Sequence, residues 1–403
     1  MQVGRSAIGG IVSKAHRSHA LTGLVDRLGQ SPTIGEKYAS AGFRPTGFDY
    51  LRISLAISIL LWHSILVCHA ENWASLVVNT QWKVPLLFLV PAFFSLSGFL
   101  IAGSLERSTI PTFIGLRILR IVPALTVDTL ITVFILGPLF TILPLQQYFY
   151  TKETGTYLLN IAGDIHYRLP GVFVHNPIRQ IINAQLWTIP WEFVCYVTIV
   201  LLAIVGIAKS RIWFLVVSVA VPLVLLVGLT IVYPRRFAPN PHLIAPHSIS
   251  IVLCFLIGIA IHKYREMIPH NSTIALAAIF GYIIARNTEY SGVVGPLFVS
   301  YITIWVGVTN FHRTGIIKGG DYSYGIYLYH CTIQQALVSV GILKWYGVFT
   351  TSVALAVAVA ALSWHFVEKP ALSFRRYLTK QSGARPVKSV EAESRWAMSS
   401  PST

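Results

Sequence analysis

The sequence predicts an all-α, polytopic membrane protein, because the chain is strongly apolar, poor in charge and divided into long hydrophobic segments. Of its 403 residues, 54% are hydrophobic and only 11% are charged, whereas about 25% of residues are charged in ordinary soluble domains. The mean hydropathy is +0.64. These values exclude a soluble multi-domain protein, and we expect no soluble catalytic domain beside the membrane region.

About ten apolar segments approach the roughly 20 residues that a membrane-spanning helix needs. They cover residues 48–70, 84–104, 112–142, 186–207, 211–232, 246–264, 272–287, 292–309, 322–342 and 347–368. The seventh and eighth segments are short and contain glycine, so they are the weakest members of the set.

The distribution of lysine and arginine predicts that both termini are cytosolic (N-in and C-in). Basic residues gather in the N-terminal tail 1–47, in the C-terminal tail 371–403 and in alternate short loops. We expect a cytoplasmic N-terminal tail without a cleavable signal peptide, a membrane domain over 48–370, and a disordered C-terminal tail. The loop 143–185 then lies outside, and its many tyrosines are typical of a sugar-facing or interfacial cap.

The net charge of +16 could suggest nucleic acid, but the basic residues lie where membrane topology places them. We therefore expect a lipid bilayer and no nucleic acid as the partner. The four cysteines stand singly in apolar segments without metal-ligand spacing, so we expect buried thiols and no metal. They are Cys68, Cys195, Cys254 and Cys331.

Arg52 and His63 form the first candidate site, inside the apolar segment 48–70. They lie three helical turns apart, so both project from nearly the same face, roughly 16 Å apart along the axis. A buried arginine in a spanning helix costs roughly 2.5–3.5 kcal/mol on insertion scales and indicates a compensating function. Imidazole titrates near neutral pH and can take a proton from a hydroxyl, so His63 is the candidate general base.

Arg117 and Arg120 are three residues apart and therefore share a helix face. In the predicted topology they lie at the depth of Arg52, near the cytosolic side. Three arginines at one depth favour a site for a polyanion, because the guanidinium group binds phosphate oxygens in a bidentate way. The alternative is that Arg117 and Arg120 only extend to lipid headgroups.

Two carboxylates lie in apolar segments and are further candidates. Asp128 continues the Arg117 face deeper into the bilayer and is either a site residue or a counter-charge for an arginine. Glu192 follows the outer boundary of its segment by about a turn, where it could orient an acceptor hydroxyl or His63. The alternative for Glu192 is a water-exposed charge at the helix end.

The segment 322–342 carries a polar stripe that predicts a helix face turned toward a cavity or the bundle interior. Ser323, Tyr327, His330 and Gln334 recur at spacings of four, three and four. We expect Tyr324, Tyr327, His330 and Trp187 to line the substrate site together with Asp128. The alternative for the aromatic residues is an interfacial belt.

Several of these motifs, taken in order, resemble the acyltransferase 3 family of integral-membrane O-acyltransferases. The matching elements are FDYLR followed by His63, FFSLSGFLI at 93–101, the Arg117/Arg120 pair, LWTIPWEF at 186–193, YSYGIYLYH at 322–330 and FVEKPAL at 366–372. The family includes O-acetyltransferases of O-antigens, exopolysaccharides and nodulation factors. This chain departs from the family pattern in its 47 leading residues and in lacking the esterase-like domain that some members carry.

The resemblance implies transfer of an acyl group, usually acetyl, from cytosolic acetyl-CoA to a hydroxyl of a glycan or lipid-linked saccharide at the cell (inner) membrane. It implies essential roles for Arg52, His63, Arg117 and Arg120. We expect the three arginines to hold acetyl-CoA, with His63 as the base and Glu192 on the acceptor side. A transient acyl-enzyme on Ser95 or Ser97 is the alternative mechanism.

A secondary transporter or flippase for a glycan or small anion is the competing function, because it would use the same polar residues as a pathway. The sequence shows no repeated halves, and its polar residues concentrate in four segments. A structural membrane subunit would explain neither the buried arginines nor His63.

Overall fold

The computed structural model describes residues 31–72, 76–77, 80–232, 248–288, 290–315 and 319–381. Within these ranges the chain forms helices joined by turns, with two isolated β-bridges and no strand. The predicted all-α class is therefore confirmed for the described residues.

Each of the ten predicted apolar segments is helical over most of its described length. The helices are α3 (Gly47–Cys68), α4 (Lys83–Glu106), α5 (Ile110–Ile131), α9 (Thr188–Ile204), α10 (Arg211–Leu215), α11 (Val221–Val232), α13 (Ser248–Lys263), α14 (Ser272–Ala285), α15 (Ser291–Gly307), α17 (Ser323–Ser339) and α18 (Trp345–Ser363). Single π-turns continue α5 at Thr132–Leu136, join α10 to α11, and continue α18 at Trp364–Glu368.

Five of the described helical segments are long and apolar enough to cross a membrane, judged by length and composition. They are Gly47–Cys68, Lys83–Glu106, Ile110–Phe140, Ala184–Ile204 and Trp345–Leu378. Four further apolar helices are shorter, with 10–17 residues. The count of ten spans and the N-in/C-in orientation remain predictions.

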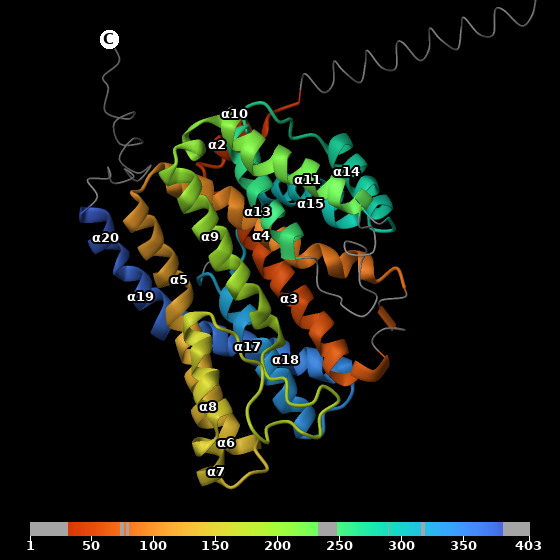
Figure 1. Ribbon diagram of the computed structural model, residues 1–403, viewed down its shortest axis with the longest axis vertical. Helices are drawn as coiled ribbons and strands as arrows, with labels where there is room; N and C mark the ends of the chain where they lie inside the picture. Colours follow the sequence, from red (N-terminus) through yellow and green to blue (C-terminus); the bar gives the residue numbers. More distant parts are fainter. Residues whose placement is uncertain are drawn as a thin grey trace, which may run out of the picture.

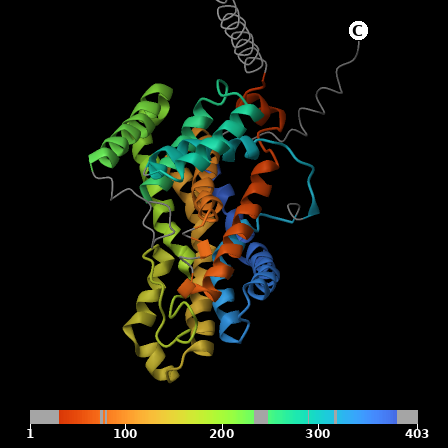
Figure 2. The same ribbon diagram turned by 90° about the vertical axis from the view of Figure 1, so that its right-hand side faces the viewer.

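Residues 143–185, the expected outer loop, lie at one end of the molecule. Helix α2 (Ile34–Ser40), the first described helix, lies at the opposite end (Figures 1 and 2). The loop contains α7 (Leu145–Tyr150) and α8 (Lys152–Tyr157). Its Tyr148 and Tyr157 are fully buried, so these two pack the core of the loop instead of facing a sugar, whereas Tyr150 is exposed. At the other end α2 begins with a capping box between Thr33 and Glu36.

Parts of both predicted tails are folded. Ile34 and Tyr38 of α2 are buried, and the backbone N–H of Ile34 donates to the carbonyl of Ile268 (2.9 Å). At the other terminus α20 (Arg375–Gln381) packs on α5, where Thr112 donates to the carbonyl of Leu378 (3.2 Å). The expected disorder is thus wrong for 371–381. The rest of both tails, 1–30 and 382–403, lies outside the described residues.

Helices α4 and α13 cross so closely that their backbones touch. A Cβ atom on Gly98 would lie 2.0 Å from the carbonyl oxygen of Phe255, and one on Gly258 would lie 2.2 Å from that of Ser95. Small residues allow such close approach between helices in membranes. Because α4 carries one wall of the cavity described below, this crossing fixes the position of that wall.

We predict that Gly98→Ala destabilises the protein, since the added methyl group forces the two helices apart. Overpacking of a close contact costs typically about 1–3 kcal/mol. The melting temperature of the detergent-solubilised variant should fall below that of Gly295→Ala, where an added Cβ meets no atom within 4 Å. Equal melting temperatures for the two variants would contradict the close crossing.

Candidate active site

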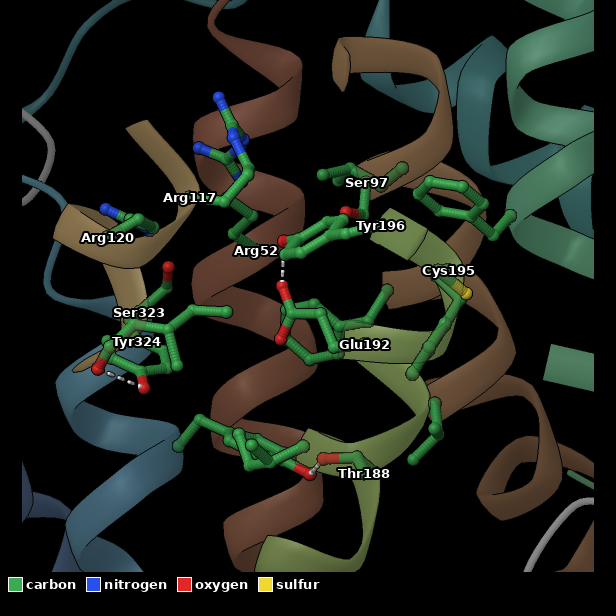
Figure 3. A pocket seen from close by; sticks show the side chains of 18 residues that line it. Arg52, Ser97, Arg117, Arg120, Thr188, Glu192, Cys195, Tyr196, Ser323 and Tyr324 are labelled. Carbon is green, nitrogen blue, oxygen red and sulfur yellow. Dashed lines mark hydrogen bonds between the residues drawn. The ribbon is translucent and has the colours of Figure 1, made fainter. Parts of the chain in front are cut away.

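A cavity of about 150 Å³ lies among α3, α4, α5, α9, α13 and α17. Figure 3 shows Arg117 and Arg120 toward one end, Glu192 and Tyr196 midway, and Thr188 at the opposite end. The lining combines these polar side chains with an apolar wall. It comprises Arg52, Val90, Phe93, Phe94, Leu96, Ser97, Arg117, Arg120, Ile121, Thr188, Ile189, Glu192, Cys195, Tyr196, Phe255, Ser323, Tyr324 and Tyr327.

Two of the three predicted arginines are held by one carboxylate. Asp321 Oδ2 accepts from Arg120 at 2.7 Å and from Arg52 at 3.2 Å, and its other oxygen accepts from Ser323 Oγ at 2.5 Å. The three charged side chains are each about one quarter exposed. Burial raises the pKa of the Asp321 carboxyl, but Arg120 and Arg52 outweigh burial and hold that pKa well below its usual range. The carboxylate is therefore ionised at neutral pH.

Sequence reasoning missed Asp321. The residue directly precedes the polar stripe of α17, in a short connection where an aspartate is commonplace. The available signal was the charge balance, since three arginines in apolar helices require a buried counter-charge. The alternative that Asp128 is the counter-charge for an arginine is wrong. Asp128 is buried and accepts from Asn183 Nδ2 (3.0 Å), and no ion pair joins it to an arginine in the described part of the chain.

Arg117 differs from the other two arginines because no carboxylate in the described part of the chain forms an ion pair with it. Among the described residues it forms no ion pair, and its Nε is buried without a hydrogen-bond partner. Its guanidinium carbon lies 5.6 Å from the centre of the Phe113 ring. A buried guanidinium N–H without an acceptor is costly, and an anionic group bound at Arg117 would offset that cost.

Glu192 lies midway along the cavity and contacts Tyr196, whose hydroxyl donates to it. The carboxylate interacts electrostatically with Arg120, Arg117 and Arg52. It is therefore not a water-exposed helix-end charge. No contact among the described residues joins Glu192 to His63, so the expected pairing of these two side chains is not found.

Tyr327 marks the end of the cavity opposite Arg117. Its hydroxyl lies 2.8 Å from Thr188 Oγ1 and donates to the carbonyl of Gln185 (3.0 Å). Its ring packs against Phe93, with the ring centres 5.9 Å apart, and lies 6.0 Å from the ring of His330. Tyr327 thus separates the cavity from the histidine behind it.

His63 and His330 form a hydrogen-bonded pair behind Tyr327, with His63 Nδ1 2.9 Å from His330 Nε2. His63 is half-buried, and His330 is fully buried. One turn further along α17, Gln334 donates to the carbonyl of Leu60 and to Ser64 (2.8 Å each). The predicted polar stripe of α17 therefore faces the bundle interior, as expected.

The structure gathers six of the sequence-predicted site residues around the cavity. They are Arg52, Arg117, Arg120, Glu192, Tyr324 and Tyr327. It places the other four outside the lining. His63 and His330 lie behind Tyr327, Asp128 lies in a buried polar network, and Trp187 packs against the large hydrophobic core beside α9. A cationic cavity that ends beside an imidazole suits transfer of a group carried by a polyanionic substrate.

Comparison with known proteins identifies the family of the chain. The family model described as an acyltransferase domain, acyltransferase 3, matches residues 46–367. The chain belongs to the acyltransferase 3 family. As a member, and with the five apolar helices above, it is a multi-pass membrane acyltransferase.

Two curated proteins are similar to this acyltransferase over most of its length. Nodulation protein 10 of Rhizobium leguminosarum bv. viciae is 27% identical over 370 residues, which cover 84% of this chain and 96% of that protein. The O-acetyl transferase of Shigella phage Sf6 is 26% identical over 300 residues, which cover 72% and 84%. No solved structure matches the chain.

We predict that Asp321→Asn destabilises the acyltransferase, because it leaves Arg52 and Arg120 without a counter-charge. Removing one partner of a buried ion pair costs about 3–5 kcal/mol, and the partial exposure here favours the lower end. Thermal unfolding measures the loss, with Asp164→Asn as the control, since that side chain is 69% exposed.

The two ion pairs of Asp321 also predict how this loss of stability depends on pH. Because the pKa of Asp321 is depressed in the folded protein, its carboxylate stabilises the fold fully above the pKa of an aspartate in the unfolded chain, about 3.9. This stabilisation is lost only as the pH falls below that value. The difference in melting temperature between wild type and Asp321→Asn should therefore be constant from about pH 6 to about pH 9. A difference that vanishes within this range would contradict the ion pair.

Proposed function

We propose that this acyltransferase moves an acetyl group from acetyl-CoA to a hydroxyl of a glycan or lipid-linked saccharide at the cell (inner) membrane. The observation that carries the proposal is Arg117, which is partly buried and whose Nε has no hydrogen-bond partner among the described residues. It lies beside the Arg52–Asp321–Arg120 cluster, in a cavity that ends next to the His63–His330 pair. The name of the phage relative, an O-acetyl transferase, supports O-acetylation.

The donor end of the cavity suits the phosphates of acetyl-CoA. Arg117 offers guanidinium N–H groups to phosphate oxygens, while Arg52 and Arg120 add positive charge that Asp321 neutralises only in part. Arginine binds phosphate in a bidentate way, which gives both affinity and orientation. The apolar wall that includes Val90 and Phe93 suits the uncharged pantetheine arm, which would extend toward Tyr327.

His63 then acts as the general base. Acetyl-CoA supplies an activated carbonyl in its thioester. His63 accepts the proton of the acceptor hydroxyl while the hydroxyl oxygen bonds to the carbonyl carbon. When the carbon–sulfur bond breaks, the proton passes from His63 to the departing thiolate, so the products are the acetyl ester and free CoA. The half-buried state of His63 leaves it accessible to an acceptor.

Direct transfer is favoured over an acyl-enzyme. Ser97 lines the cavity beside Tyr196 (Figure 3), and Ser95 Oγ is buried without a hydrogen-bond partner. Neither serine has a hydrogen bond to a histidine in the described part of the chain. An activated serine nucleophile needs such a base within reach.

We predict that Arg117→Gln raises the KM for acetyl-CoA about tenfold or more, because a charge-assisted hydrogen bond contributes about 1.5–3 kcal/mol. The value of kcat should stay within about twofold, as expected for an interaction that holds the substrate equally before and during the reaction. Transfer of radiolabel from acetyl-CoA in membranes measures both constants. Arg211→Gln, an exposed arginine at the start of α10, is the control. An unchanged KM would contradict the phosphate site.

We also predict that His63→Ala lowers transfer at least a hundredfold, since general-base catalysis contributes about 10²–10⁴-fold. The variant should insert into membranes at normal levels and bind acetyl-CoA as before. His312→Ala, in the exposed connection after α15, is the control and should retain wild-type transfer. Retained transfer in a well-inserted His63→Ala protein would exclude the base assignment.

The function itself is tested by comparing surface glycans and lipid-linked saccharides from cells with and without the protein. Radiolabel from acetyl-CoA should enter one of these saccharides only when the protein is present. A secondary transporter or flippase predicts a different result. Proteoliposomes would then move the saccharide across the bilayer without acetylating it, and equally well with the His63→Ala protein.

A further inference from the structure

We propose, on the basis of the base role of His63 given above, that His330 is a positioning residue that fixes the tautomer of His63. In this arrangement His63 carries its proton on Nδ1, and the lone pair on Nε2 is the basic one. The evidence is the set of neighbours around the two rings.

The neighbours of His330 Nδ1 determine where the proton of that ring lies. Nδ1 is 2.8 Å from the carbonyl oxygen of Tyr327 and 3.2 Å from that of Ile326. Carbonyl oxygens only accept hydrogen bonds, so Nδ1 of His330 must be the protonated nitrogen. The ring is fully buried without a carboxylate partner among the described residues, which disfavours a second proton on it.

The other nitrogen of His330 therefore carries a lone pair. Its two neighbours can both donate, namely His63 Nδ1 at 2.9 Å and Cys331 Sγ at 3.5 Å. His63 must then place its own proton on Nδ1 and donate it to His330. This leaves Nε2 of His63 unprotonated and free to accept a proton from a hydroxyl. His63 also forms a hydrogen bond with the backbone of Ile59 in its own helix. Without His330 this contact alone would set the tautomer, so we expect the second neutral tautomer of His63 to gain population.

The pairing also explains how His63 can carry a positive charge for a moment inside the bundle. When Nε2 takes a proton from the acceptor, the hydrogen bond from Nδ1 to His330 becomes charge-assisted and stronger. His330 in turn donates to the carbonyl of Tyr327, so the chain of hydrogen bonds is polarised away from the reacting centre. No proton needs to leave His330 at any step.

The side chains around the two rings could alternatively form a metal site. His63, His330 and Cys331 each offer one ligand atom, and these atoms lie within 4.8 Å of one another. A metal would require lone pairs on both facing nitrogens, whereas 2.9 Å is an ordinary hydrogen-bond distance for one donor and one acceptor. We therefore assign a proton, not a metal, between the two rings.

Two substitutions at His330 test the positioning role. His330→Gln keeps an oxygen that can accept from His63, whereas His330→Leu removes every acceptor. We expect kcat of His330→Leu to lie at least tenfold below that of wild type. The kcat of His330→Gln should be at least three times that of His330→Leu. The KM for acetyl-CoA should stay within about twofold in both variants, because His330 is outside the cavity lining.

Gln334→Leu is the matched control, because Gln334 joins the same two helices through Leu60 and Ser64 without touching His63. It should lower the melting temperature while kcat stays within about threefold of wild type. If Gln334→Leu and His330→Leu lose kcat equally, or if His330→Gln is no better than His330→Leu, the positioning role is wrong.

The tautomer itself is measured by ¹⁵N NMR of the histidine-labelled protein without substrate, with the His63 signals identified by their loss in His63→Ala. We expect protonated Nδ1 and unprotonated Nε2 in wild type, and a mixture in His330→Leu. A protonated Nε2 in wild type, or one equivalent of bound zinc in the purified protein, would overturn the proposal. Because this spectrum needs no turnover, it separates failure of the pairing from failure of the acetyl-transfer function.

Discussion

The ion cluster of Arg52, Asp321 and Arg120 is the interaction on which the rest of the site depends. It joins α3, α5 and the start of α17, three elements far apart in the sequence. Two arginines in apolar helices would be costly alone, and one carboxylate makes them compatible with a membrane. Because Asp321 pairs with two of the three arginines, we propose that Arg117, which forms no ion pair among the described residues, binds the substrate anion.

The same cluster sets the relation between the two ends of the site. Arg52 and His63 lie along α3, and their partners Asp321 and His330 follow in the same order along the start and middle of α17. The two helices therefore run parallel. The Arg52–Asp321 ion pair joins them near their N-terminal ends, and the His63–His330 hydrogen bond joins them further along. Tyr327, on α17 between these contacts, closes the cavity on the side of the histidines. The contacts that hold Arg52 and His63 in place thus belong to one helix pair.

Much of this arrangement could be predicted from the sequence, because apolar length and helical spacing are local properties. The ten helical segments, the inward-facing stripe of α17 and the shared cavity of Arg52, Arg117 and Arg120 follow from them. The partners could not be predicted, since a pair such as Arg120 and Asp321 is 201 residues apart along the chain. Asp128 was the nearer carboxylate on the arginine helix, yet the fold turns it toward Asn183.

A structure of the protein bound to an acetyl-CoA analogue, with a thioether that cannot transfer its acyl group, would show directly whether Arg117 binds the phosphates and whether His63 lies at the reacting carbonyl. We expect its phosphates on Arg117, with Arg52 and Arg120 nearby, and its acyl carbonyl at the Tyr327 end of the cavity, toward His63. An analogue bound elsewhere, or a saccharide occupying the arginine end of the cavity, would contradict the role of Arg117 as the phosphate-binding residue.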